Sequence, residues 1–146
     1  MSHGSRTAPS PDTYLHDLNG RKGEEPVSTK DNKATLRQAN AAMAAGDTEG
    51  FLSHCAEDVE WTFVGERTLA GKKDIREYLA QTYGKPPKFD VSNLIAEGDF
   101  VTALGQITIT APDGKSSAYW YCDVWRFRGG QMAELRAFVV AQASPT

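Results

Sequence analysis

The feature that most constrains the fold is that every segment after residue 88 has the pattern of a β-strand. Apolar and polar residues alternate, and the strand patterns are separated only by Gly98-Asp99, Pro112 to Lys115, and Gly129-Gly130. Connections this short join antiparallel neighbours. We therefore predict an antiparallel meander of four strands, over residues 89–97, 100–111, 116–128 and 132–141.

The segments before residue 88 combine helices with one strand. Residues 34–45 are rich in strong helix formers, and Gly46 is suited to end that helix. Asp47 has the chemistry of an N-cap for a short helix over 50–55. The remaining pattern predicts a strand over 59–64, a loop over 65–71 and a helix over 73–83.

Helices followed by a meander are typical of the α+β class. We predict a cone-shaped α+β barrel, in which a curved antiparallel sheet wraps around three N-terminal helices and encloses a pocket. Residues 1–32 are rich in proline, glycine and charge and poor in large apolar side chains. We interpret residues 1–32 as a flexible leader or a segment left by cloning, and residues 33–146 as the folded domain.

Composition excludes several classes of function. The net charge of −3 gives no electrostatic case for binding nucleic acid or an acidic membrane. No apolar run is long enough to span a membrane, and the N-terminus has no signal-peptide core. Cys55 and Cys122 form no CxxC pair, and His54 has no companion at ligand spacing. We expect a cytoplasmic protein without a metal ion or cofactor, with Cys122 as a small buried apolar residue.

One carboxyl group stands out in the strand over 116–128. Because side chains alternate between strand faces, Asp123 shares a face with four aromatic residues: Tyr119, Tyr121, Trp125 and Phe127. An ionised carboxylate among aromatics loses its hydration, so Asp123 is predicted to be paired, functional or held neutral. A neutral carboxyl group in an apolar site donates a hydrogen bond to a bound ligand. The alternative is an edge-strand aspartate bonded to Arg126, Arg136 or a backbone amide.

If Asp123 faces a pocket, the other predicted ligand-binding residues follow from strand register. Tyr119, Tyr121 and Trp125 point the same way, and Trp61 and Phe63 form the opposite wall. Helical residues Tyr78 and Tyr83 cover the mouth. In the long strand over 100–111 we expect Leu104, Gln106 and Thr108 to face inward. The alternative is that the aromatic side chains fill a solid core.

Two groups of segments carry a resemblance to a known family. The N-terminal group is Gly46-Asp47, Phe51 to Trp61 and Leu69 to Arg76. The C-terminal group is Tyr121 to Phe127, Gly130 and Leu135 to Phe138. Together they resemble the SnoaL-like branch of the nuclear transport factor 2-like superfamily, which includes the ketosteroid isomerases. The resemblance covers residues 34 to 142. It implies a cone with a pocket and often a homodimer formed through the sheet.

The resemblance carries over only part of the family chemistry. The protonated aspartate of the ketosteroid isomerases corresponds to Asp123. Their base falls near Thr62, and their oxyanion tyrosine near Ala39, where this chain has neither group. Ala137 stands where related hydrolases and polyketide cyclases place an aspartate. Steroid isomerisation is therefore not expected.

Two functions remain open from the sequence. The first is a cofactor-independent isomerase, cyclase or lyase that uses Asp123 as acid or oxyanion donor, assisted by Tyr121. The second is a non-catalytic ligand-binding or dimerisation module. In both, the partner is a small apolar or polycyclic molecule. A homodimer is expected through the outer sheet face, which carries Trp120, Val124, Arg126, Arg136 and Phe138.

Overall fold

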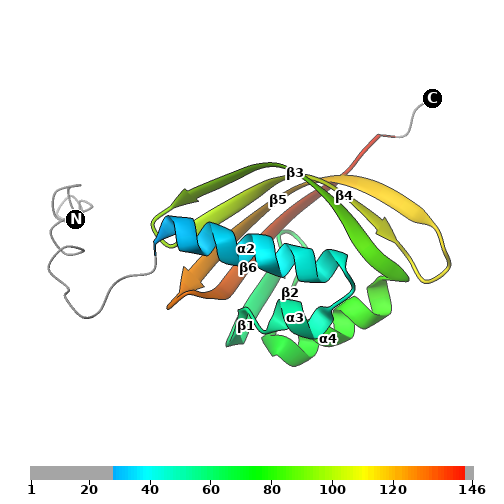
Figure 1. The fold of residues 1–146 in the computed structure, drawn as a ribbon. Helices are drawn as coiled ribbons and strands as arrows, with labels where there is room; N and C mark the ends of the chain where they lie inside the picture. The colour runs from blue at the N-terminus through cyan, green and yellow to red at the C-terminus, as the bar shows by residue number, and fades with distance from the viewer. Residues whose placement is uncertain (1–27, 144–146) are drawn as a thin grey trace, which may run out of the picture.

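A computed structural model describes residues 28–143 of the chain. These residues form three helices and a six-stranded sheet with the strand order β2-β1-β6-β5-β4-β3. The helices lie on the concave side of the curved sheet (Figure 1). The elements are α2 (Thr29–Ala44), α3 (Thr48–Leu52), β1 (Cys55–Phe63), β2 (Arg67–Ala70), α4 (Gly71–Thr82), β3 (Lys85–Glu97), β4 (Phe100–Thr110), β5 (Ser116–Arg128) and β6 (Gln131–Ala141).

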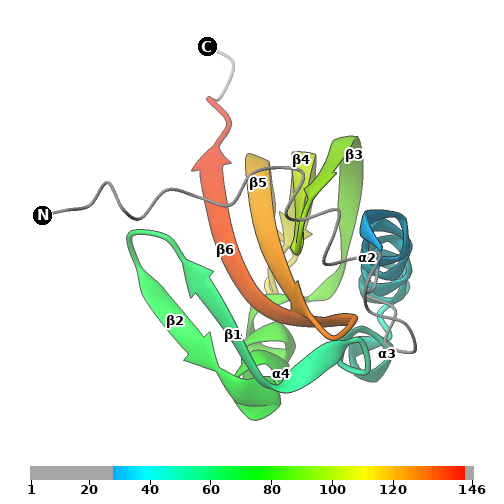
Figure 2. The ribbon, with the colours of Figure 1, turned by 90° about the vertical axis from the view of Figure 1, so that its left-hand side faces the viewer.

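The predicted α+β architecture is confirmed, but the sheet is mixed rather than purely antiparallel. β1 pairs with β6 in parallel, from Cys55↔Met132 to Phe63↔Ala137. The last strand of the meander returns beside β1 and runs in the same direction, although α4 and four strands separate the two in the sequence. Figure 2 shows the resulting bend, which places the edge strands β2 and β3 on opposite sides of the molecule.

Residues 67–70 form a strand where a loop was predicted. β2 pairs antiparallel with β1 between Glu60↔Ala70 and Phe63↔Arg67. The strand is too short to show a period in the sequence. It is stabilised by tertiary contacts, since Leu69 is buried opposite Trp61.

The helix boundaries differ by a few residues from the predicted ones. α2 begins at Thr29, where the Ser28 hydroxyl accepts a hydrogen bond from the Asp31 backbone amide at 3.0 Å. Residues 28–32 therefore contribute the N-cap and first turn of α2, whereas residues 1–27 of the predicted leader lie outside the described part of the chain. Asp47 caps α3 as predicted, accepting from the Gly50 amide at 2.9 Å.

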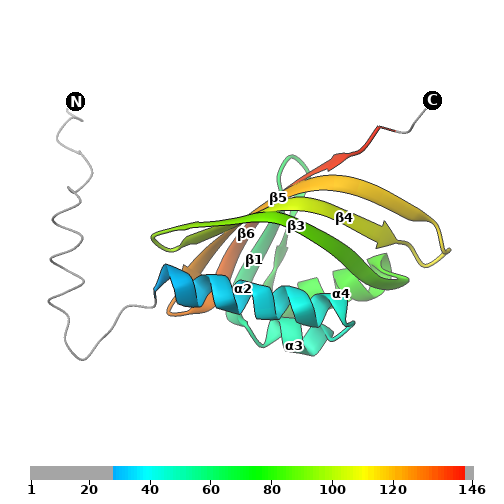
Figure 3. The same ribbon diagram turned by 45° about the horizontal axis from the view of Figure 1, so that its top comes forward.

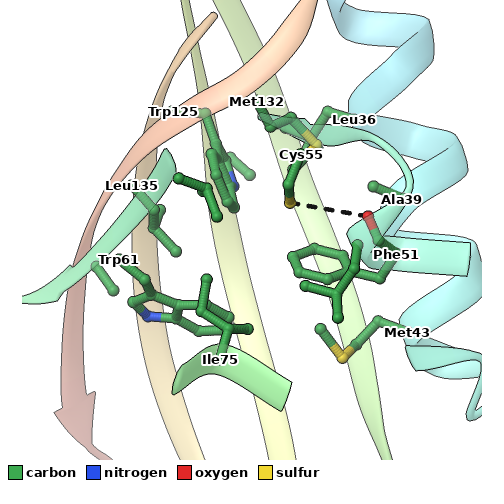
Figure 4. Packing of buried hydrophobic residues seen from close by; sticks show 14 of the residues in the cluster. Leu36, Ala39, Met43, Phe51, Cys55, Trp61, Ile75, Trp125, Met132 and Leu135 are labelled. Atoms are coloured by element: carbon green, nitrogen blue, oxygen red, sulfur yellow. Dashed lines mark hydrogen bonds between the residues drawn. The ribbon is translucent and has the colours of Figure 1, made fainter. Parts of the chain in front are cut away.

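A hydrophobic core fills the space between the helices and the concave face of the sheet (Figure 4). α2 runs along β3 and β4 (Figure 3), and its buried stripe meets α3 and the inner face of the sheet. The Cys55 thiol is buried and donates to the Phe51 carbonyl at 3.8 Å, and this burial raises the pKa of Cys55 to about 12. The largest fully buried side chains include Phe127, Leu36, Leu52, Ile75, Met132 and Leu135.

The two faces of β5 differ as the alternation predicts. Tyr121, Trp125 and Phe127 are buried on the concave face, whereas Trp120 is 53% exposed on the convex face. Cys122 also lies on the convex face and is partly exposed, so its prediction as a buried residue is wrong. Its side chain points away from the core because its neighbours in the sequence point inward.

The inward prediction for Leu104, Gln106 and Thr108 is wrong. Gln106 pairs with Trp120 of the convex face, and its side-chain oxygen accepts from Gln142 Nε2 at 2.8 Å. The inward positions of β4 are instead the odd-numbered ones, Val101, Ala103 and Ile107 among them. Both faces of β4 carry apolar residues, so the pairing with β5 decides which face is buried.

Candidate active site

The wide end of the cone holds a cavity of about 390 Å³. Its mouth lies where three segments meet: the β1–β2 turn, the end of α4 and the β4–β5 turn. The exposed lining residues are Glu66 and Arg67 at the β1–β2 turn, Lys115 and Ser117 at the β4–β5 turn and the start of β5, and Val139 of β6, while Thr82 and Tyr83 at the end of α4 are half-buried. The buried lining residues include Met43, Phe51, Trp61, Trp125, Leu135 and Ala137. A cavity of this size accommodates a small organic molecule.

Aromatic rings form most of one wall. The centroids of Trp61 and Phe63 are 5.6 Å apart, and those of Phe63 and Tyr78 are 5.2 Å apart. Tyr83 contacts Tyr78 edge-on at 6.4 Å. The side chains belong to β1 and α4, so a strand and a helix together present a continuous aromatic surface to the cavity.

The structure brings together nearly all of the predicted site residues. The cavity lining includes Trp61, Phe63, Tyr78, Tyr83, Tyr119, Tyr121, Asp123 and Trp125. Gln106 is outside the lining because it faces the opposite side of the sheet. The cavity lining and the hydrophobic core share residues. The aromatic side chains therefore both line a pocket and pack into the core, which were the two alternatives predicted from the sequence.

Asp123 lies in the middle of β5, directly between two alanines. Its partners on the neighbouring strands are Ala103 of β4 and Ala137 of β6. The small side chains of both alanines leave open space beside the carboxyl group. Within residues 28–143, Asp123 has neither a hydrogen bond nor an ion pair. Burial raises the pKa of Asp123 to about 7, so at neutral pH a large fraction is protonated.

The predicted alternative of a paired aspartate is wrong. Arg126 lies on the other face of β5, where its Nε donates to Glu134 Oε1 at 3.0 Å. Arg136 is exposed on the same convex face, opposite Val124. Strand alternation therefore separates both arginines from Asp123, and Arg126 instead pairs with Glu134 on the convex face.

Two further polar groups in the lining lack partners. The Tyr121 hydroxyl and the Trp61 Nε1 are buried and have no hydrogen-bond partner among the described residues. Burial, and then the nearby Asp123 carboxyl, raise the pKa of Tyr121, which keeps its hydroxyl protonated as a donor. A buried donor without a partner costs about 1–3 kcal/mol, and an acceptor atom on a ligand would recover part of it.

The sequence reasoning missed the charged residues of the mouth. Glu66 and Arg67 were assigned to a loop, and Lys115 to a turn, so none had a predicted direction. The one sequence feature that could have indicated a place at the cavity mouth is that these residues lie close to the ends of predicted strands. His54 lies in the turn between α3 and β1 and is not part of the cavity lining.

Two observations limit the kinds of site present. Among residues 28–143, no group of three or more His, Cys, Asp or Glu side chains is arranged to hold a metal ion. Of the helices that the structure describes, none has the length and apolar character needed to cross a membrane.

Comparison with known proteins identifies both a family and a fold. A family model described as a SnoaL-like domain matches residues 36–135. No curated protein matches the chain. Among solved structures, an NTF2-like protein of unknown function from Burkholderia pseudomallei K96243 is 23% identical, with a TM-score of 0.65 over 73% of this chain and 88% of that one.

Two other solved structures bear on the cavity. TerC, crystallised with polyporic acid, is 24% identical with a TM-score of 0.64, over 74% of this chain and 90% of that one. A protein from Jannaschia sp. CCS1, assigned to the SnoaL-like polyketide cyclases, is 16% identical with a TM-score of 0.68, over 86% of this chain and 100% of that one. At these identities the likeness establishes a shared fold.

Proposed function

The chain belongs to the SnoaL-like domain family, and on this premise we propose that its cavity binds a small aromatic or polycyclic molecule with Asp123 as the polar anchor. The aromatic wall supplies stacking and apolar contact. The polar groups near the bottom of the cavity supply orientation, as in most small-molecule sites.

One observation carries this proposal: Asp123 is a carboxyl group inside an aromatic cavity, and it has no partner among residues 28–143. A structural aspartate at this depth would have a cation or backbone amides around it. Asp123 has alanines on both sides and open space in front. Its protonated form donates a hydrogen bond, so it fits a ligand that presents a carbonyl or enol oxygen.

The fold neighbours support a ligand of this kind. TerC was crystallised with polyporic acid, a small organic molecule. The Jannaschia protein is assigned to a class of cyclases that act on polyketides. These properties belong to those proteins, and for this chain they favour an oxygenated aromatic ligand over a purely aliphatic one.

In catalysis, Asp123 would act as a general acid or would stabilise an oxyanion, with the Tyr121 hydroxyl as a second donor. Isomerase, cyclase and lyase reactions on a carbonyl compound all need such a group. The competing function is a non-catalytic binding module. It is favoured by the absence of any carboxylate or imidazole beside Asp123 in the described lining, where Glu66 at the exposed mouth is the only other carboxylate.

A matched pair of probes tests the anchor. 2-Acetylnaphthalene and 2-ethylnaphthalene have the same ring system, and only the first carries a carbonyl oxygen. We expect Asp123→Ala to weaken 2-acetylnaphthalene about tenfold and to leave 2-ethylnaphthalene nearly unchanged, measured by quenching of tryptophan fluorescence. Asp123→Asn keeps a donor, so affinity for 2-acetylnaphthalene should stay within about threefold of the wild type, above that of Asp123→Ala.

The pH dependence of probe affinity tests the role of the Asp123 carboxyl group independently of the comparison between probes. Because the donor is the protonated carboxyl, affinity of the wild type for 2-acetylnaphthalene should fall as pH rises through about 7, the pKa of Asp123. Asp123→Asn should remove that dependence, and Tyr121→Phe should preserve it. Equal affinities of the two probes at every pH would contradict the role of Asp123.

We also propose that the protein is a homodimer joined through the convex face of the sheet. Trp120 is 53% exposed there, Phe138 43% and Val140 61%. Register places Trp120 opposite Val140, with Phe138 opposite Cys122 on the same face. The mixture of aromatic, aliphatic and arginine side chains is typical of the centre of an interface.

A further inference from the structure

The mouth of the cavity carries more positive than negative charge, although the protein as a whole is acidic. The exposed charged residues of the cavity lining are Arg67, Lys115 and Glu66, whereas Asp113, whose carboxylate accepts from the Lys115 amide, lies outside the lining. Neither cation forms an ion pair within residues 28–143. The whole chain has a net charge of −3, so this local excess of cations is not a consequence of composition.

The two cations come from different elements on the rim of the cavity. Arg67 is the first residue of β2 and pairs with Phe63, whose ring lines the cavity. Its guanidinium lies 5.3 Å from the centroid of the Tyr78 ring. Stacking on an aromatic face holds the guanidinium over the aromatic wall while leaving its N–H donors open to a second group.

Lys115 belongs to a turn whose backbone is held by hydrogen bonds. Its amide donates to Asp113 Oδ1 at 2.9 Å, and its carbonyl accepts from the Ala111 amide, also at 2.9 Å. The turn therefore carries the lysine at a defined place on the rim. Arg67 and Lys115 are thus two exposed cations, on different segments, that line the same cavity.

Resting on the proposed function, we infer that the ligand is an aromatic acid, whose anionic group stays at the mouth between Arg67 and Lys115. The ring system enters the cavity, and an acceptor oxygen reaches the inner donors. A carboxylate, sulfonate or acidic phenol placed at the mouth keeps part of its hydration, whereas the same group placed deeper would be desolvated near Asp123. The cations also favour encounter with an anion over a neutral analogue.

Two fluorescent probes separate this inference from the proposed function. 1-Anilinonaphthalene-8-sulfonate and N-phenyl-1-naphthylamine share one ring system, and only the first carries a negative charge. We expect Arg67→Gln to weaken the sulfonate probe about tenfold and Lys115→Gln to weaken it severalfold. The neutral probe should change less than about twofold in both variants, since it makes no charged contact.

Three controls assign the effects. Lys88→Gln removes an equal charge from an exposed residue of β3 outside the cavity lining, and should change neither probe. Ala137→Phe fills the buried site beside Asp123, and should abolish cavity binding of both probes. Thermal unfolding of each variant verifies that it is folded. Raising the salt concentration from about 0.05 to 0.5 M should weaken the sulfonate probe and spare the neutral one.

The possible failures are distinct. A neutral probe that does not bind, or that ignores Ala137→Phe, would overturn the aromatic cavity itself. If the neutral probe binds in the cavity but the sulfonate probe is insensitive to both charge removals, the anionic ligand is excluded and the proposed function stands. If Arg67→Gln weakens both probes equally, Arg67 acts only by supporting Tyr78, and its role in recognising an anion is excluded.

Discussion

At the scale of single residues, the unusual property of this protein is a carboxyl group that is half-buried in an aromatic cavity and has no hydrogen-bond partner among residues 28–143. Asp123 lies between Ala103 and Ala137 on adjacent strands. Within the described part of the chain no cation pairs with Asp123, and burial disfavours its charged form, so its pKa rises to about 7. Burial keeps Asp123 protonated, so that it can donate a hydrogen bond, and it lowers the stability of the folded state whenever the carboxyl group ionises.

That cost predicts a pH-dependent stability. The pKa of Asp123 rises from the ordinary 3.8 to about 7 on folding, so the folded chain binds the proton more tightly. The resulting stabilisation is complete below the unfolded pKa and is lost as pH rises toward the folded one, at up to about 1.36 kcal/mol per pH unit. Above about pH 8 no further loss is expected.

Asp123→Asn removes this linkage. Between pH 5 and pH 7, the variant should gain roughly 2–3 kcal/mol in unfolding free energy relative to the wild type. Urea unfolding at several pH values measures the difference. Asp99→Asn makes the same chemical change in the exposed β3–β4 turn, outside the cavity lining, and is the matched control. A difference that does not vary with pH for Asp123→Asn would show that its carboxyl group is solvated in the folded protein.

At the scale of elements, the pairing of β3 with β4 brings two backbones unusually close. A Cβ atom at Gly105 would collide with the carbonyl oxygen of Asp90. The register of this pair shifts between Val91 and Asn93, beside the same glycine. The irregularity adds curvature to the sheet where β3 bends over α2.

Gly105→Ala should therefore destabilise the protein by about 1–3 kcal/mol, because the two strands must separate to admit the methyl group. Gly65→Ala is the control: Gly65 has a φ of 89° but no atom within 4 Å of the added Cβ, so it should cost only about 1–2 kcal/mol. Chemical denaturation of both variants gives the comparison. Equal losses of unfolding free energy would mean that the clash between the strands at position 105 costs no more than the left-handed backbone strain at position 65.

At the scale of the whole molecule, the curved sheet has two different faces with different roles. The concave face encloses the core and the cavity. The convex face exposes aromatic and aliphatic side chains that a monomer would leave in water. The proposed homodimer covers these side chains, and symmetric dimers are the commonest oligomers of such proteins.

Analytical ultracentrifugation at micromolar concentration should show a dimer. Trp120→Glu should convert it to a monomer, because the buried carboxylate would lack a partner at the interface. Val64→Glu, in the β1–β2 turn, exchanges another exposed apolar residue and should leave the dimer intact. A monomeric wild type would assign the convex face to a different partner.

Most of the element order could be predicted from the sequence, because the signals are local. The short turns around Gly98, Gly114 and Gly129 and the alternation between them predict the meander, and Asp47 predicts the start of α3. The concave side of β5 was also predictable. Its alternation places Asp123 on one face with Tyr121 and Trp125, whatever the neighbouring strands are.

Tertiary structure alone decided the features that depend on neighbouring strands. Gln106 faces outward because β4 carries apolar residues on both faces, and only its pairing with β5 selects one of them. The parallel contact of β1 with β6 and the strand character of β2 likewise exist only once the sheet closes. Asp123 follows the same rule. Strand alternation alone determines the direction of its side chain. Its neighbours on other strands, Ala103 and Ala137, leave open space beside the carboxyl group and offer it no hydrogen-bonding side chain, and its burial in the folded protein raises its pKa.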